Sequence, residues 1–265
     1  MRLITYNILN GGQDDLNFKR LQYALEVISS CSPDILVLNE CMFFDINGFR
    51  LLYLFERELG MRGILAHAKT GQHVALFIKP TCTILEARMD ADPFFHATIY
   101  AKLLTGKDFN LTIIGTHLNP FGGENRIREV QYLTDYAHAN EIVFLLGDLN
   151  SLNPHEDHSA NISALPPNFR GRHLMPGDTH TVDTRVIATL EAAQFIDLYR
   201  LKNPDSHDYT APTKLVNYTE FARMRVDYIF GTAKAEELTT SCKIIKTDAA
   251  NLASDHFPVI ADFTL

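Results

Sequence analysis

The first forty residues alternate between apolar runs typical of strands and a pattern typical of a helix. The run RLITYNIL (2–9) contains mostly strand-forming residues and stops at a turn signal, Asn-Gly-Gly. Apolar residues then recur at helical spacing over 16–28, and DILVLNE (34–40) is a second apolar strand. This strand-helix-strand unit favours parallel pairing of its strands, which places Asn7 and Glu40 at the same carboxyl edge.

Strand and helix patterns continue to the end of the chain. They predict helices at 48–59, 124–139 and 185–194, and strands at 73–79, 82–88, 95–104, 109–117, 142–147, 226–230, 242–247 and 257–263. The residues Thr105-Gly106-Lys107-Asp108 join two of these strands as an antiparallel hairpin. Because no linker, repeat or low-complexity tract interrupts the pattern, we expect a single α/β domain over 1–265, with mixed sheets and helices packed outside them.

Composition and charge narrow the class of protein. The 265 residues are 46% hydrophobic and 21% charged, which is ordinary for a globular chain with a sizeable core. The formal net charge is -8, with 24 Lys and Arg against 32 Asp and Glu. This balance argues against tight, sequence-blind binding of long nucleic acid, which depends on basic residues that neutralise phosphates. The balance of charge is compatible with a small anionic substrate.

The sequence gives no sign of export or of a membrane span. The start, MRLITYNILNGG, lacks the continuous apolar core of a secretory signal, and no run approaches the roughly 20 apolar residues of a membrane helix. The four cysteines, Cys31, Cys41, Cys82 and Cys242, have no metal-ligand spacing. We therefore expect a cytoplasmic protein with reduced thiols.

Polar side chains follow or interrupt the apolar strands at a recurring set of positions. A polar residue at a strand end is commonly a turn residue, so each position alone carries little weight. Taken together they use only Asn, Asp, Glu and His, which supply hard oxygen ligands for Mg²⁺ or Mn²⁺ and imidazoles that exchange protons near neutral pH. The set is Asn7, Glu40, His117, Asp148, Asn150, Asp227, Asp255 and His256.

Six short motifs carry these residues in order along nearly the whole chain. They are TYN (5–7), LNE (38–40), THL (116–118), GDLN (147–150), RVDYIF (225–230) and SDHFP (254–258). In this order the sequence resembles the endonuclease/exonuclease/phosphatase superfamily of metal-dependent phosphoesterases. The resemblance implies a four-layer α/β sandwich of two mixed β-sheets stacked face to face and flanked by helices.

The resemblance also implies a role for each motif residue. Asn7, Glu40 and Asp255 correspond to the metal site, and the cofactor expected there is Mg²⁺, for which Mn²⁺ can substitute. Hard ligands of this kind leave coordination positions for water and for a phosphate oxygen.

The remaining motif residues correspond to the catalytic groups. Asp148 resembles the residue that orients or deprotonates the attacking water, and Asn150 the amide that holds the water or a phosphate oxygen. His256 resembles an imidazole beside the phosphate, held and kept charged by Asp227. His117 resembles the second imidazole that faces the phosphate.

The motifs do not assign the chain to one branch of the superfamily. The segment 195–213 resembles part of the exonuclease and abasic-site endonuclease branch, but the chain has no Trp, and His117 stands where that branch has a tyrosine. The His form resembles pancreatic-type deoxyribonucleases, deadenylases, sphingomyelinases and uncharacterised bacterial members. The Pro- and His-rich segment 152–181 follows the Asp148 strand, so we expect it to overhang the pocket and to set specificity.

The sequence therefore predicts a hydrolase that cleaves a phosphate ester by metal-assisted in-line attack of water. One hypothesis for its partner is a short or single-stranded nucleic acid. The alternative is a small-molecule or lipid head-group phosphate ester. A third, from a different class, is a binding module that keeps the fold without the chemistry, and the presence of every motif residue argues against it.

Overall fold

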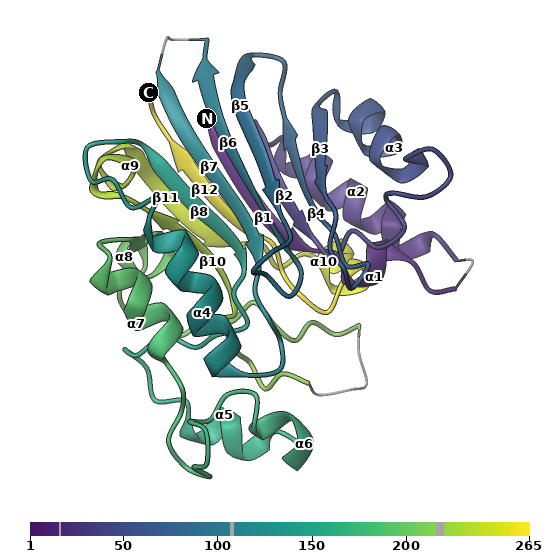
Figure 1. Cartoon of the computed structure of the whole chain (residues 1–265). Helices are drawn as coiled ribbons and strands as arrows, with labels where there is room; N and C mark the ends of the chain where they lie inside the picture. The colour runs from purple at the N-terminus through teal and green to yellow at the C-terminus, as the bar shows by residue number, and fades with distance from the viewer. Residues whose placement is uncertain (16, 107–108, 216–219) are drawn as a thin grey trace.

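The computed structural model describes residues 1–15, 17–106, 109–215 and 220–265, and it contains two six-stranded sheets (Figure 1). The first sheet has the order β11 (Thr239–Ile244), β12 (Val259–Phe263), β1 (Arg2–Asn7), β2 (Ile35–Asn39), β4 (Val74–Ile78), β3 (Arg62–Ala66). The second has the order β5 (Cys82–Asp90), β6 (Ala97–Thr105), β7 (Asn110–His117), β8 (Val143–Asp148), β10 (Asp227–Gly231), β9 (Ile196–Asp197). Both sheets are mixed, because β1 pairs with β2 and β7 with β8 in parallel while the other pairs are antiparallel.

Helices cover the outer faces of both sheets, which confirms the predicted four-layer α/β sandwich (Figure 1). The outer face of the first sheet packs against α2 (Lys19–Cys31), α3 (Arg50–Leu59) and α10 (Asp248–Ala253). The outer face of the second packs against α4 (Gly123–Thr134) and α7 (Arg185–Ala192). The shorter helices are α1 (Leu9–Gly12), α5 (Ser159–Ala164), α6 (Pro167–Arg170), α8 (Leu198–Lys202) and α9 (Ala233–Leu238).

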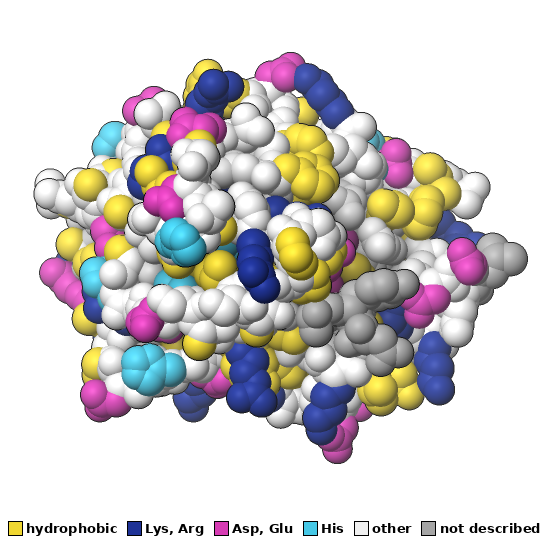
Figure 2. Space-filling view, turned by 90° about the horizontal axis from the view of Figure 1, so that it is seen from below, with side chains coloured by type: hydrophobic (Ala, Val, Ile, Leu, Met, Phe, Trp, Pro, Cys, Tyr) yellow, Lys and Arg dark blue, Asp and Glu magenta, His cyan; other side chains and the backbone are white. Residues whose placement is uncertain are grey.

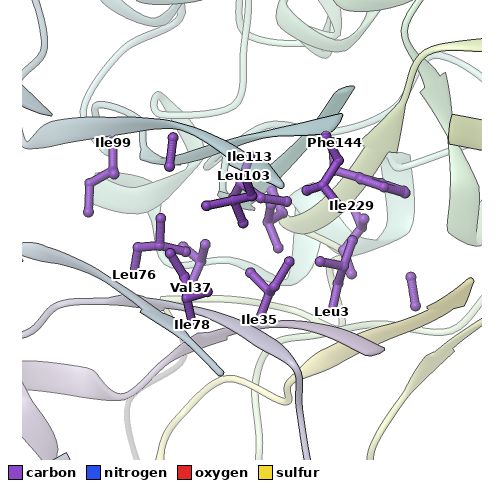
Figure 3. Packing of buried hydrophobic residues seen from close by; sticks show 14 of the residues in the cluster. Leu3, Ile35, Val37, Leu76, Ile78, Ile99, Leu103, Ile113, Phe144 and Ile229 are labelled. Atoms are coloured by element: carbon purple, nitrogen blue, oxygen red, sulfur yellow. The ribbon is translucent and has the colours of Figure 1, made fainter. Parts of the chain in front are cut away.

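Successive side chains of a strand point to opposite faces of its sheet, and in the central strands both sets of side chains are apolar. In β2, Ile35 and Val37 point between the sheets, where they join Ile113 and Phe144 of the second sheet (Figure 3). Leu36 and its alternate neighbours point the other way, toward the helices. Each fully buried side chain of this kind stabilises the fold by about 1.5–3 kcal/mol. The core between the sheets therefore fixes how the two sheets meet.

The structure moves several predicted boundaries and adds elements that the patterns did not reveal. The helix predicted to reach residue 139 ends at Thr134, and the strand predicted at 242–247 begins at Thr239. Strand β3 and the short helices α8, α9 and α10 were not predicted. The antiparallel pairing of β6 with β7 is confirmed, while residue 16 of the first predicted helix and residues 107 and 108 of the hairpin lie outside the described residues.

Segment 152–181, predicted as irregular, contains α5 and α6 and has a small apolar cluster of its own. Leu152, Ile162 and Leu174 pack there against Met224 and Val226, which precede β10. The segment is therefore anchored to the second sheet. All four cysteines are free and buried, and no helix in the described part of the chain is long and apolar enough to cross a membrane.

Gly147 is the position at which the backbone leading to Asp148 requires glycine. Its φ is 151°, and a Cβ built there would lie 1.8 Å from the carbonyl oxygen of Thr116 on the neighbouring strand. Thr116 is also its register partner in the parallel pair of β7 and β8. A side chain at this position would force the two strands apart.

We predict that Gly147→Ala destabilises the protein by more than about 3 kcal/mol, since backbone strain adds to a clash with main-chain atoms. The matched control is Gly71→Ala. Gly71 has a φ of 81° but nothing within 4 Å of its Cβ position, so only the strain of about 1–3 kcal/mol applies. Urea unfolding of both variants measures the difference, and equal losses would contradict the close approach at Gly147.

Candidate active site

Three neighbouring strands of the second sheet bring His117, Asp148 and Asp227 side by side. His117 and Asp148 are partners in the parallel register of β7 and β8, and Asp148 and Asp227 are partners in the antiparallel register of β8 and β10. Asp227 was predicted inside its strand but is the first residue of β10. Because β10 runs opposite to β8, the start of β10 lies beside the end of β8.

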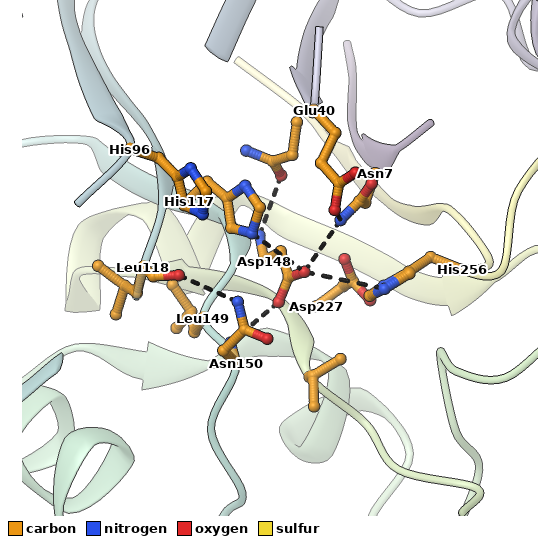
Figure 4. Close-up of polar contacts among 12 residues, drawn as sticks. Asn7, Glu40, His96, His117, Leu118, Asp148, Leu149, Asn150, Asp227 and His256 are labelled. Atoms are coloured by element: carbon orange, nitrogen blue, oxygen red, sulfur yellow. Dashed lines mark hydrogen bonds and ion pairs between the residues drawn. The ribbon is translucent and has the colours of Figure 1, made fainter. Parts of the chain in front are cut away.

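The first sheet contributes the other half of the site. Asn7 ends β1, Glu40 follows β2, and Asp255 and His256 lie in the loop between α10 and β12. The two halves meet at a cavity of about 280 Å³. Most of the predicted residues line it, namely Glu40, His117, Asp148, Asn150, Asp255 and His256, while Asn7 and Asp227 contact the lining residues from behind (Figure 4).

Asn7 joins carboxylates from the two sheets. Its Nδ2 donates to Oε1 of Glu40 at 3.1 Å and to Oδ2 of Asp148 at 3.0 Å (Figure 4). Its Oδ1 accepts from the backbone N–H of Leu9 at 3.0 Å. In this arrangement Asn7 holds the two carboxylates in place, and its assignment as a metal ligand stays a prediction that requires its amide to turn.

Asn39 is a structural link that the sequence pattern does not reveal. Its Nδ2 donates to the carbonyl of Thr116 at 2.9 Å, and its Oδ1 accepts from the backbone N–H of Asp148 at 3.0 Å. The side chain is fully buried and spans from β2 of the first sheet to β7 and β8 of the second. It lies inside the LNE motif, whose middle residue therefore joins the sheets while Glu40 faces the cavity.

His256 and Asp227 form a buried charged pair. Nδ1 of His256 lies 2.8 Å from Oδ2 of Asp227. Burial opposes a charge on His256, but the carboxylates of Asp227 and Asp255 hold the pKa of the imidazole well above its usual value. Arg225 pairs with Asp197 at 2.7 Å, so it is not the partner of Asp227. The other end of the ring, Nε2, lies 3.8 Å from Oδ2 of Asp148.

Asp148 is a carboxylate poised to exchange a proton near neutral pH. Burial and the negative charge of Asp227 raise the pKa of Asp148 to about 7. Its Oδ1 accepts from the backbone N–H of Asn150 at 2.9 Å, and the Nδ2 of Asn150 donates to the carbonyl of Leu118 at 3.0 Å. A carboxylate with such a pKa suits the role of a general base.

His96 is a cavity residue that the pattern of strand ends does not reveal. Its ring stacks on that of His117 with centroids 4.0 Å apart and planes at 16° (Figure 4). Burial holds the pKa of His117 well below its usual value and lowers that of His96 to about 4, so both rings are neutral at neutral pH. His96 precedes β6, whose start lies beside the end of antiparallel β7, so it reaches the site from the opposite end of a strand.

The segment 152–181 reaches the cavity through Arg172, not through its histidines. Arg172 lines the cavity and pairs with Glu220 at 2.8 Å, and its guanidinium lies 5.3 Å from the centre of the Phe121 ring. The histidines of this segment do not line the cavity; they are His155, His158, His173 and His180. The predicted position of the segment beside the pocket thus fits the structure, while its role in specificity stays a prediction.

The chemistry of the donor set fits a divalent cation. Glu40, Asp148, Asp227 and Asp255 meet around one charged imidazole, which leaves an excess of negative charge. Burial and the charge of Asp255 raise the pKa of Glu40, and a cation bound beside it would favour its charged form. Glu40 and Asp255 both line the cavity and offer the hard oxygens that Mg²⁺ prefers.

Within the described part of the chain, two groups of His, Asp and Glu side chains lie close enough to hold a metal ion, but in each group the nitrogens of one imidazole are already engaged within the protein. Asp148, Asp227 and His256 have ligand atoms within 4.8 Å of one another, yet His256 is engaged by Asp227 through Nδ1 and charged. In the second group, Nδ1 of His73 accepts from a backbone N–H at 2.9 Å, which leaves the proton on Nε2, 3.1 Å from Asp45. Neither of these two imidazoles has a free lone pair for a metal.

The protein is an α/β sandwich of two stacked mixed sheets, with carboxylates and imidazoles gathered around a cavity at one end. The chain belongs to the endonuclease/exonuclease/phosphatase family, which it matches over residues 4–256. A search of curated proteins by sequence finds no match.

Similar solved structures share this fold at low sequence identity. An AP endonuclease from Archaeoglobus fulgidus has a TM-score of 0.71 at 19% identity, with all of both chains covered. Truncated TDP2 from Caenorhabditis elegans has a TM-score of 0.66 at 15% identity, covering 100% of this chain and 97% of that one. The mannosyl-6-phosphatase Bt3783 of Bacteroides thetaiotaomicron VPI-5482 has a TM-score of 0.67 at 16% identity, again over both whole chains.

We predict that Asp227 and His256 act as a unit. Asp227→Asn and His256→Ala should each lower kcat/KM by on the order of 10²-fold or more, because either change removes the charged imidazole from the cavity. The double variant should lose little more than the more damaged single variant. Kinetics on bis-p-nitrophenyl phosphate, with thermal melts alongside, measure the coupling; rate losses that multiply would mean that the two residues work independently.

Proposed function

We propose that this protein hydrolyses a phosphate ester by in-line attack of water, with Mg²⁺ as its cofactor and Mn²⁺ as a substitute. One observation carries the proposal. A buried carboxylate with a pKa of about 7, Asp148, and a charged imidazole, His256, share one small cavity with the carboxylates of Glu40 and Asp255. That combination offers a proton acceptor, a positive charge for a phosphate oxygen and hard oxygens for a cation.

Each side chain has a role that follows from its contacts. Asp148, aligned by the backbone N–H of Asn150, takes a proton from the attacking water. His256, kept charged by Asp227, donates its Nε2–H to the phosphate and balances the charge that develops there. Glu40 and Asp255, with Asn7 once its amide turns, would hold the cation. A bound Mg²⁺ supplies Lewis-acid polarisation of the phosphate oxygens.

The lining of the cavity favours a small phosphate ester. Arg172 is the one Lys or Arg among the described lining residues, and Glu220 neutralises it at 2.8 Å. On the end of the molecule that holds the site, basic side chains are scattered among acidic and apolar ones (Figure 2). Long nucleic acid needs several unpaired cations along its backbone. A similar structure is a mannosyl-6-phosphatase, which agrees with a small monoester substrate.

Hydrolysis of nucleic-acid ends is the second candidate, favoured by the similarity to an AP endonuclease. A panel of sugar phosphates, inositol phosphates, phospholipids, nucleotides and short oligonucleotides separates the two. We expect turnover of small phosphate esters in Mg²⁺ and none in EDTA. Turnover of oligonucleotides alone would favour the nuclease, and no turnover of any ester in Mg²⁺ or Mn²⁺ would contradict the proposed function.

We predict that Glu40→Gln weakens Mg²⁺ binding and leaves the fold intact, because a charged ligand is replaced by a neutral one of the same size. A cation that binds only the folded state at 100 times its Kd stabilises it by about 2.7 kcal/mol. The melting temperature of the wild-type protein should therefore rise with Mg²⁺, and that of the variant should rise much less.

The matched control is Glu26→Gln, which removes an exposed carboxylate of α2 that lies outside the cavity. This variant should keep both the melting response to Mg²⁺ and the rate of the wild-type protein. An unchanged Mg²⁺ response in Glu40→Gln would refute the assignment of Glu40 to the cation.

A further inference from the structure

His96 has a hydrogen-bonding atom for which the fold provides no partner. The residue is 0% exposed, and its Nε2 has no hydrogen-bond partner among the described residues. A buried polar atom left without a partner costs about 1–3 kcal/mol, so folded proteins rarely keep one without a function. Because His96 lines the cavity, a ligand in the cavity is the available partner.

Thr70 is the hydrogen-bond partner of the other ring nitrogen of His96. The Thr70 hydroxyl oxygen lies 2.8 Å from Nδ1 of His96 and accepts from the backbone N–H of Gln72 at 3.4 Å. The hydroxyl proton can be donated to Nδ1, and in that arrangement the ring proton of the neutral imidazole lies on Nε2. In this tautomer the unpartnered atom is an N–H donor, and a ligand that meets it offers an acceptor.

The other donors near the cavity are largely committed to the protein itself. The side-chain amide of Asn7 donates its two N–H groups to Glu40 and Asp148. The side-chain amide of Asn150 donates to the carbonyl of Leu118. A phosphate oxygen that enters a cavity lined by carboxylates needs donors to offset their repulsion. The Nε2–H of a neutral imidazole meets that need without adding a further charge.

We propose that His96 is a further substrate-contacting residue, whose Nε2–H donates a hydrogen bond to a phosphate oxygen and whose tautomer is set by Thr70. This proposal rests on the proposed function and adds a further imidazole to the phosphate site, next to the His117 ring on which it stacks. The competing interpretation is that His96 serves only as a flat surface that packs against His117.

Substitutions of His96 separate these two roles. His96→Phe keeps a flat ring for stacking and removes the N–H, whereas His96→Gln loses the ring and keeps an amide donor. Thr70→Val removes the hydroxyl that fixes the tautomer and leaves His96 in place, and Thr70→Ser keeps it. His155→Phe is the matched control, since His155 bonds Glu191 outside the cavity.

The measurement is the Kd of inorganic phosphate in the presence of Mg²⁺, by calorimetry, with kcat/KM on an accepted ester and thermal melts alongside. His96→Phe should weaken phosphate binding by about 10- to 100-fold without lowering the melting temperature, as expected for one lost hydrogen bond to a charged group. His96→Gln should recover much of the affinity. Thr70→Val should weaken binding, and Thr70→Ser and His155→Phe should not.

The outcomes distinguish this proposal from the proposed function. If His96→Phe binds phosphate as tightly as the wild-type protein, His96 is a packing surface and the proposal is wrong, whatever the enzyme hydrolyses. If His96→Phe does not fold, unchanged phosphate binding in Thr70→Val would equally show the proposal to be wrong. A wild-type protein that binds phosphate with the expected dependence on His96 but cleaves no ester would overturn only the proposed function. Failure of the wild-type protein to bind phosphate would overturn both.

Discussion

The site exists only because two sheets meet at a fixed separation and register, and the buried amides of Asn39 and Asn7 hold that junction. Asn39 bonds main-chain atoms of β7 and β8 from its position on β2, and Asn7 links a carboxylate of each sheet. These groups are buried, so removal of one partner leaves the other without a hydrogen bond. A small shift between the sheets would therefore separate Glu40 from Asp148.

The same junction gathers polar groups that the protein alone does not satisfy. Oδ1 of Asp227, Nδ1 of His117 and Nε2 of His96 all lack a partner among the described residues. The pKa values of Glu40 and Asp148 are raised because burial and neighbouring carboxylates disfavour their charges. The core between the sheets, by contrast, is apolar. Unpartnered polar atoms and shifted pKa values gathered at one cavity are the pattern expected of a functional site.

Much of this arrangement could be predicted from the sequence, because apolar strands that end in Asn, Asp, Glu or His identify both the sheets and the edge where their ends meet. His96 could not be found in this way, since it lies inside the predicted strand 95–104 and belongs to none of the six motifs, and Asn39 looks like one more residue of a buried strand. Arg172 reaches the cavity only through the fold of its segment. Short elements such as β3 and α8 leave too few residues for a recognisable period.

The central claim is that the cavity between the sheets binds a divalent cation together with a phosphate. Anomalous diffraction from crystals grown with Mn²⁺ and inorganic phosphate tests it directly. We expect one Mn²⁺ peak in contact with Glu40 and Asp255, and a phosphate within hydrogen-bonding distance of His256. An empty cavity in crystals that hold Mn²⁺ elsewhere, for example beside Asp45 and His67, would contradict the account.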